Sequence, residues 1–140
     1  MKKLTISLIF FIFMINIAGC TCDNTISSTS ISTLADTSWL FQKYGEPSKL
    51  TTVSSSISIT LNFRGLGGFD GSTGINNYGG GCRIEDNKIA IISLTQTTQQ
   101  DPYGLVYLDL LRQATSFELT KNQLIIKCQN GQELVFEAKK

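Results

Sequence analysis

Histidine is absent from the 140-residue chain, which also has only one tryptophan and two prolines. Without an imidazole group, the chain cannot form the serine or cysteine dyads and triads in which histidine is the general base. The usual zinc sites are excluded as well, because they rely on histidine or on cysteine pairs, and the four cysteines include no Cys-x-x-Cys pair. We therefore expect neither a histidine-dependent active site nor a metal site.

A strong net charge is also lacking, since twelve Lys and Arg residues face eleven Asp and Glu residues. When Lys2 and Lys3 are set aside, ten basic residues remain against the same eleven acidic ones. The chain contains no run of like charges and no interleaving of basic and aromatic residues. Such a balance provides no electrostatic footprint for nucleic acid, so we expect no nucleic-acid partner.

The stretch from Gly68 to Cys82 has the glycine density of a phosphate-binding loop but not its pattern. It lacks the Gly-Lys-Ser/Thr ending of a Walker loop, and strand patterns flank it on both sides, whereas a dinucleotide fingerprint opens a helix. Glycine between strands supplies positive φ angles, bulges or close backbone approach, and asparagine tolerates the left-handed region. The stretch predicts a turn in which Asn76 and Asn77 precede Tyr78, and no cofactor is expected.

Carboxylate pairs are the remaining catalytic candidates, for example Asp70 with Glu85 or Asp101 with Asp109. Each of these acids is more typical of a solvated turn or a helix cap. A calcium loop that begins at Asp70 fails, because a glycine stands at the twelfth position, where the bidentate glutamate belongs. We expect no enzymatic activity and no catalytic residue.

The N-terminus has the zones of a secretory signal. Lys2 and Lys3 precede an apolar run, Leu4–Ala18, and the sequence IAGC ends at Cys20. An uncleaved membrane anchor is the alternative, but the run is shorter than the roughly 20 residues that cross a bilayer. IAGC resembles the lipobox of bacterial lipoproteins, which implies that residues 1–19 are removed as a signal peptide and that Cys20 is lipidated.

Lipidation would attach the chain to a membrane, because two or more acyl chains on Cys20 anchor it stably. We expect a protein of the cell envelope that faces the periplasm or the cell exterior. In a host with an outer membrane, Thr21 in place of an aspartate resembles the signal for sorting there. Residues 20–35 are rich in serine and threonine and predict a flexible tether.

Residues 36–140 have the length of one domain, and their pattern is mostly strand. In SISITLNF the apolar side chains at 57, 59, 61 and 63 alternate with polar ones, which indicates a half-buried strand. SWLFQKY predicts an opening strand. RIEDNKIAIISL, SFELTKNQLIIKC and QELVFEA predict a meander, with Asn130-Gly131 as a hairpin turn.

Helical spacing interrupts this pattern once. Residues 102–113 predict a helix with Asp101 as the N-cap and Pro102 at the first helical position. We expect Leu108 and Leu111 to pack into the core as the helix covers one end of the sheet. A helix that binds a partner is the alternative.

These elements together resemble the META domain, also called the HslJ-like domain, over nearly the whole chain after Trp39. The glycine stretch matches the characteristic loop of that family at five positions, namely Gly71, Gly74, Asn76, Tyr78 and Gly80. The resemblance implies that these residues form a structural turn. The resemblance implies a mainly β fold, namely a small antiparallel β-barrel-like or highly curved sheet with one helix. It also implies a domain without an established enzymatic activity.

The cysteines depart from this family. Ile75 stands where the family loop has its cysteine, and Cys82 takes the place of the final aromatic residue of that loop. An exported protein can keep disulfides, and we predict one between Cys82 and Cys128, with Cys22 left over near the lipid. The alternative is that Cys82 and Cys128 are separate small core residues.

Two functions remain open. The first is a lipid-anchored, monomeric domain that contacts another envelope protein or has an envelope stress or stability role, as the resemblance suggests. The second is a carrier or chaperone that binds a lipid or other apolar ligand inside the barrel. We expect the interior to be filled, which favours the first, by Trp39, Phe41, Ile59, Leu61, Phe63, Phe117, Leu119, Leu124, Ile126 and Phe136.

Overall fold

The computed structural model describes residues 34–140, so the predicted signal peptide, Cys20, Cys22 and most of the tether lie outside the described residues. The strands are β1 (Ser38–Glu46), β2 (Lys49–Thr52), β3 (Thr60–Phe63), β4 (Gly68–Ser72), β5 (Asn77–Glu85), β6 (Lys88–Gln96), β7 (Ala114–Leu119), β8 (Gln123–Cys128) and β9 (Glu133–Ala138). The helices are the short 3₁₀ turn η1 (Gly65–Gly67) and the α-helix α2 (Pro102–Arg112). None of the helices within residues 34–140 is long and apolar enough to cross a membrane.

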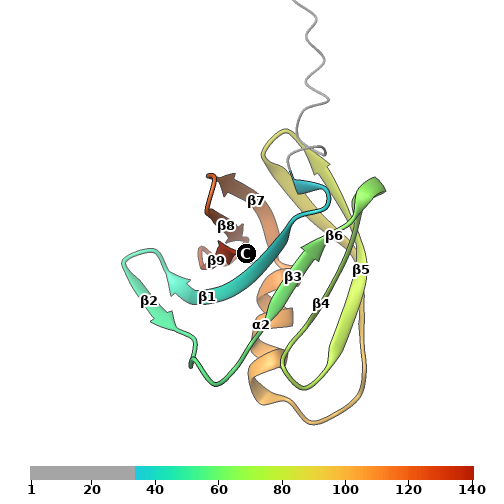
Figure 1. Cartoon of the computed structure of the whole chain (residues 1–140). Coiled ribbons are helices and arrows are strands. Elements are labelled where there is room, and N and C mark those ends of the chain that lie inside the picture. Colours follow the sequence, from blue (N-terminus) through green and yellow to red (C-terminus); the bar gives the residue numbers. More distant parts are fainter. Residues whose placement is uncertain (1–33) are drawn as a thin grey trace, which may run out of the picture.

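The nine strands form one antiparallel sheet in the order β2-β1-β3-β4-β5-β6-β7-β8-β9. β1 also pairs with β9, and this pairing closes all strands except β2 into a barrel of eight strands. β6 and β7 pair at Lys88 and Ser116, and next to this pair the Phe117 N–H donates to the Asn87 carbonyl (2.8 Å). Figure 1 shows α2 at the lower end of the barrel, between the β1–β2 hairpin and β5. The mainly β barrel with a helix that the sequence predicts is therefore confirmed.

Turn chemistry fixes two of the hairpins where the sequence places them. The turn between β5 and β6 falls at Asp86 and Asn87, and Asp86 adopts a φ of 54°. The turn between β8 and β9 contains Asn130 and Gly131, and Gly131 adopts a φ of 81°. Both turns use residue types that tolerate positive φ.

One predicted strand is shorter than its alternation suggests. The pattern at 57–63 predicts a strand from Ile57, but β3 begins only at Thr60. The sequence analysis did not predict β2. Its four residues form a hairpin with the second half of β1, and they lie on the same side of β1 as β3, which pairs with the first half. Between the backbone bonds that Val53 and Ile59 form with β1, residues 54–58 leave the sheet through a turn in which the Ile57 N–H donates to the Ser54 carbonyl (3.0 Å). The sheet is therefore split between β2 and β3.

Side chains fill the interior of the barrel. The buried cluster contains every predicted core residue except Leu119, which is half-buried at its edge. α2 adds five buried residues to this core: Gly104, Tyr107, Leu108, Leu110 and Leu111. The helix therefore covers one end of the sheet, as its apolar spacing predicts, and Leu108 and Leu111 are core residues.

Candidate functional site

The start of α2 is fixed by a buried carboxylate. Asp101 is only 4% exposed, and its Oδ1 accepts a hydrogen bond from the Gly104 N–H at 2.8 Å, as expected of an N-cap. Its other oxygen, Oδ2, accepts a hydrogen bond from the hydroxyl of Thr73 in the β4–β5 turn. The carboxylate thus ties the first turn of the helix to that hairpin.

The β4–β5 turn also holds in place the segment that precedes α2. The side-chain oxygen of Asn76 accepts from the Gln99 N–H (2.9 Å) and from the Thr97 hydroxyl (2.9 Å), and its amide nitrogen donates to the Gln99 carbonyl (3.0 Å). Asn76 is 1% exposed, so these bonds satisfy its buried side-chain atoms. Asn76 lies in the predicted turn, and its side chain holds the segment that leads into α2.

A second polar contact joins the middle of the helix to the sheet. Tyr107 is 1% exposed, and its hydroxyl lies 2.7 Å from that of Tyr78 on β5. The Tyr78 hydroxyl donates to the Thr60 carbonyl at 2.6 Å. Burial raises the pKa of both phenols above 10.0, so both are neutral at physiological pH.

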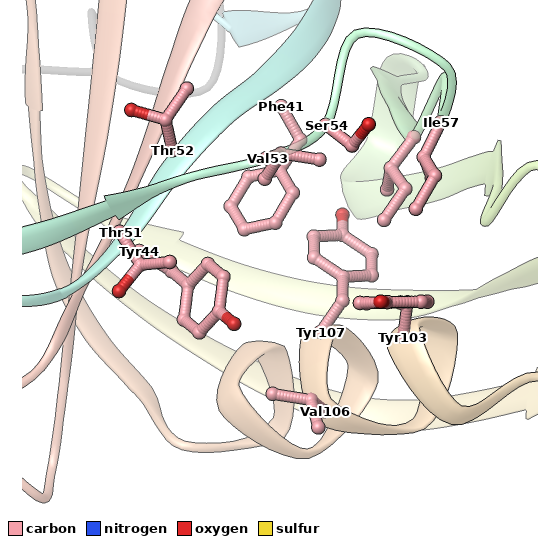
Figure 2. Close-up of a pocket in the computed structure, with 11 residues that line it drawn as sticks. Phe41, Tyr44, Thr51, Thr52, Val53, Ser54, Ile57, Tyr103, Val106 and Tyr107 are labelled. Atoms are coloured by element: carbon pink, nitrogen blue, oxygen red, sulfur yellow. The ribbon is translucent and has the colours of Figure 1, made fainter.

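The helix and the split in the sheet enclose an apolar pocket of about 200 Å³. Figure 2 shows the rings of Phe41, Tyr44 and Tyr107 around it, with Ile57 and Tyr103 on one side. The lining consists of Phe41, Tyr44, Thr51, Thr52, Val53, Ser54, Ile57, Ile59, Tyr103, Val106 and Tyr107. None of these side chains is charged, so the pocket can hold an apolar group.

The outer wall of this pocket is open to solvent. Tyr103 is 65% exposed and Val106 is 48% exposed, and both project from α2. Ile57 and Tyr103 also line a neighbouring hollow that contains Ile75, which is 55% exposed. The floor, by contrast, is buried, and the ring centroids of Phe41 and Tyr107 lie 4.9 Å apart within the packed core. We call the pocket together with Tyr103 and Val106 the aromatic pocket.

The carboxylates considered in the sequence analysis do not pair with one another. Asp70 accepts hydrogen bonds from Arg64 (2.6 Å) and Asn62 (2.8 Å), and the bond from Arg64 contributes most to lowering its pKa. Asp109 forms an ion pair with Arg112 on the exposed face of α2. No group of three or more potential metal ligands occurs within residues 34–140.

The residues that match the META loop are distributed over two strands and a shorter turn than the sequence suggested. Gly71 lies in β4, Tyr78 and Gly80 lie in β5, and the turn itself spans Thr73 to Asn76, with the Thr73 N–H donating to the Asn76 carbonyl (2.8 Å). A Cβ atom at position 71 would lie 2.5 Å from the Tyr78 hydroxyl, so close packing rather than a turn requires that glycine. Only Gly74 adopts a positive φ, 93°, in the turn.

The predicted disulfide is not present in the structure, because Cys82 and Cys128 are both free thiols. Cys82 lies on β5 and Cys128 on β8, with two strands between them in the sheet order. The Cys128 Sγ donates instead to the Leu110 carbonyl on α2, at 3.3 Å. Both side chains are buried, so the structure matches the alternative of two separate small core residues.

The aromatic pocket escaped the sequence analysis. Tyr103 and Val106 belong to the predicted helix, but Thr51, Thr52 and Val53 carried no recognised pattern, and Ile57 had been assigned to a strand. The available signal was the cluster of exposed apolar residues on the first turns of a short helix. It could have been found by counting the apolar positions that lie outside the buried stripe of that helix.

Eight closed antiparallel strands with a helix at one end define the class of small filled β-barrels. The sequence matches the META domain over residues 32–140, and the chain therefore belongs to the META domain family. No match was found among curated proteins.

Two solved structures have related folds. One is the NMR structure of a protein from Burkholderia xenovorans, with a TM-score of 0.64, 24% identity, and coverage of 78% of this chain and 86% of that one. The other is the crystal structure of a DUF4847 family protein from Bacteroides vulgatus, with a TM-score of 0.62, 15% identity, and coverage of 76% and 94%. At these identities the similarity concerns the fold alone.

Proposed function

We propose that the protein is a lipid-anchored cell-envelope protein whose META domain is a non-catalytic module that binds another envelope protein. The observation that carries the interaction role is the aromatic pocket, which is apolar, uncharged and open to solvent beside Tyr103 and Val106. Aromatic side chains that combine a packed base with an exposed rim are typical of binding hot spots.

The size of the pocket also favours a protein partner. Its volume of about 200 Å³ is below the roughly 300–1,000 Å³ of sites that bury a small-molecule ligand. The barrel interior is occupied by the buried cluster around Phe136 and Leu124, which argues against a lipid carrier. A pocket of this size suits one apolar side chain that anchors a larger interface.

Photo-crosslinking tests the interaction. We would replace Tyr103 by p-benzoylphenylalanine in the full chain, in cells, and use Ile92 as the control position because it is 62% exposed on β6. We expect an adduct of discrete mass from position 103 that is absent at 92 and is lost when Val106→Asp is added. Equal adducts from both positions, or none from position 103, would contradict the interaction role.

The lipid anchor is supported by the sequence of residues 1–20 and needs its own test. Metabolic labelling with an alkyne palmitate, followed by membrane fractionation, would compare Cys20→Ala with Cys22→Ala. Cys20→Ala should lose the label and remain unprocessed, whereas Cys22→Ala should keep label, processing and membrane association. A Cys22→Ala variant that loses the label, or a Cys20→Ala variant that keeps it, would refute the assignment of Cys20.

Native mass spectrometry would separate the interaction role from the carrier role. We expect the purified full chain, released from detergent in the instrument, to have the mass of the protein with its own anchor. An additional stoichiometric lipid that survives this release would favour a carrier.

A further inference from the structure

An unpaired strand edge lies beside the aromatic pocket. β2 pairs only with β1. The Val53 N–H donates to the Gln42 carbonyl (2.8 Å), so the alternation of an antiparallel ladder turns the N–H and C=O groups of Leu50 and Thr52 away from β1. Within residues 34–140 no strand and no backbone hydrogen bond reaches these outward groups.

Such an edge is complementary to one kind of ligand. A row of free backbone donors and acceptors is satisfied by another extended backbone, as in the addition of a peptide strand to a sheet. A lipid chain or a compact small molecule cannot provide this regular spacing. β2 contains no proline, and no bulge interrupts its pairing with β1.

The aromatic pocket lies on one face of this edge. Thr51 stands directly opposite Tyr44, and both side chains line the pocket. Tyr103 and Val106 on α2 form the facing wall, as Figure 2 shows. Since side chains alternate along a strand, a peptide added outside β2 would direct every second side chain toward the face of Thr51. One of them would enter the space between β2 and the helix.

Lys49 adds a charge to the same face. It lies two residues from Thr51 on β2, so the two side chains share a face. Lys49 is exposed and forms no ion pair within the described part of the chain. Side chains opposite each other on neighbouring strands lie roughly 5 Å apart, so a carboxylate on the peptide can reach it.

We propose that the β2 edge and the aromatic pocket together bind an extended peptide segment of an envelope protein. The segment adds to β2 as a strand, places an apolar side chain in the pocket and presents a carboxylate to Lys49, two residues from the apolar one. This inference rests on the proposed interaction function and names the chemistry of the partner.

The test uses the full lipidated chain, labelled with ¹⁵N in phospholipid nanodiscs, and the blocked peptide Thr-Val-Thr-Leu-Thr-Asp-Thr. Strand addition should slow amide hydrogen exchange at Leu50 and Thr52, about tenfold when nine in ten chains are occupied. The N–H groups that face β1, such as that of Val53, should change little. Binding in the pocket alone would perturb Tyr103 without protecting these edge amides.

Two substitutions test the charge. Lys49→Glu should weaken peptide binding about threefold to fivefold, as expected for an exposed ion pair, and a peptide with lysine in place of aspartate should restore it. Lys43→Glu is the matched control, because Lys43 pairs with Thr52 and therefore lies on the opposite face. Equal losses in the two variants would overturn the predicted contact and with it the proposed register.

A third substitution tests the edge itself. Thr52→Pro removes one outward N–H, and proline is tolerated on an edge strand whose N–H faces solvent. We expect this variant to keep a folded ¹⁵N spectrum and to lose the protection at Leu50. Unchanged peptide affinity in this variant would overturn strand addition.

The remaining outcomes separate this inference from the proposed function. No binding at millimolar peptide, or binding without protection of Leu50 and Thr52, refutes strand addition. Protection that grows with protein concentration in the absence of peptide assigns the edge to a second copy of the chain, which also refutes it. A partner still crosslinked from position 103 in any of these cases leaves the interaction function standing.

Discussion

The hydroxyl of Tyr107 on α2 donates a hydrogen bond to the hydroxyl of Tyr78 on β5, 2.7 Å away. The direction follows from the third partner, because the Thr60 carbonyl can only accept and therefore takes the Tyr78 proton. The helix is thus linked to β5 and β3 through two neutral phenols in the core. This link holds Tyr107 at the floor of the aromatic pocket.

Removing the two hydroxyls should have unequal effects. Tyr78→Phe leaves both the Tyr107 hydroxyl and the Thr60 carbonyl without their partner, so the free energy of unfolding should fall by about 2–3 kcal/mol. Tyr107→Phe keeps the bond from Tyr78 to Thr60 and should reduce it by about 1 kcal/mol. Urea unfolding monitored by circular dichroism measures both values. A larger loss for Tyr107→Phe would contradict the donor order.

The same pair should make the fold sensitive to alkali. Burial raises the pKa of Tyr78 and Tyr107 above 10.0 in the folded state, whereas both phenols ionise near that value once unfolded. Below pH 10 both states are neutral and stability is unaffected; above it, stability falls by about 1.4 kcal/mol per pH unit for each phenol. Tyr107→Phe removes one of the two phenols, so its free energy of unfolding should decrease less steeply with pH, by the contribution of one phenol. Unfolding free energies at several alkaline pH values test this, and equal slopes would contradict it.

The sequence predicted the elements whose signals are local. Asp101 and Pro102 mark the start of α2, and Asn130-Gly131 marks a hairpin, because these residues act within one turn of backbone. The interior side chains could be listed for the same reason, since strand alternation assigns faces without knowledge of the partners. The resemblance to the META domain then supplied the arrangement.

The aromatic pocket could not be predicted in this way because it depends on a break in a pattern. Ile57 continues the alternation of β3, yet the sheet splits before it and the residue faces α2. The role of Asn76 could not be predicted either, because its side chain forms hydrogen bonds with Gln99, which is distant in sequence. The predicted disulfide was wrong for the structure, in which both cysteines are free thiols and the Cys128 Sγ donates to the Leu110 carbonyl.

The glycines of β5 give a prediction about packing. A Cβ atom at Gly80 would lie 1.9 Å from the backbone carbonyl oxygen of Ser93 on β6, a clash that the ladder can relieve only by moving apart. Gly80→Ala should lower the free energy of unfolding by about 3 kcal/mol or more. Gly65→Ala is the control, because no atom lies within 4 Å of its Cβ position. Thermal unfolding of both variants tests this, and equal melting temperatures would refute the clash.

The carboxylate of Asp101 gives a prediction about the helix. Asp101→Ala removes the cap of Gly104 and the acceptor of the buried Thr73 hydroxyl, so the free energy of unfolding should fall by about 2–3 kcal/mol. Asp101→Asn keeps one side-chain oxygen for the cap, so its free energy of unfolding should fall by about half as much. Chemical denaturation gives both values, and amide exchange at Gly104 reports the cap directly. Similar losses in the two variants would indicate that the cap contributes little.

The two buried thiols lead to a prediction about redox chemistry. Burial raises the pKa of Cys82 and raises that of Cys128 to about 11, with the charge of Glu133 adding to the latter, so little thiolate forms at neutral pH. Because the thiolate is the reactive species, both cysteines should resist maleimide labelling until the domain unfolds. Peptide mapping under non-reducing conditions should recover each as a free thiol after purification in air. Recovery of a peptide pair linked by a Cys82–Cys128 disulfide would contradict the prediction that both thiols stay reduced.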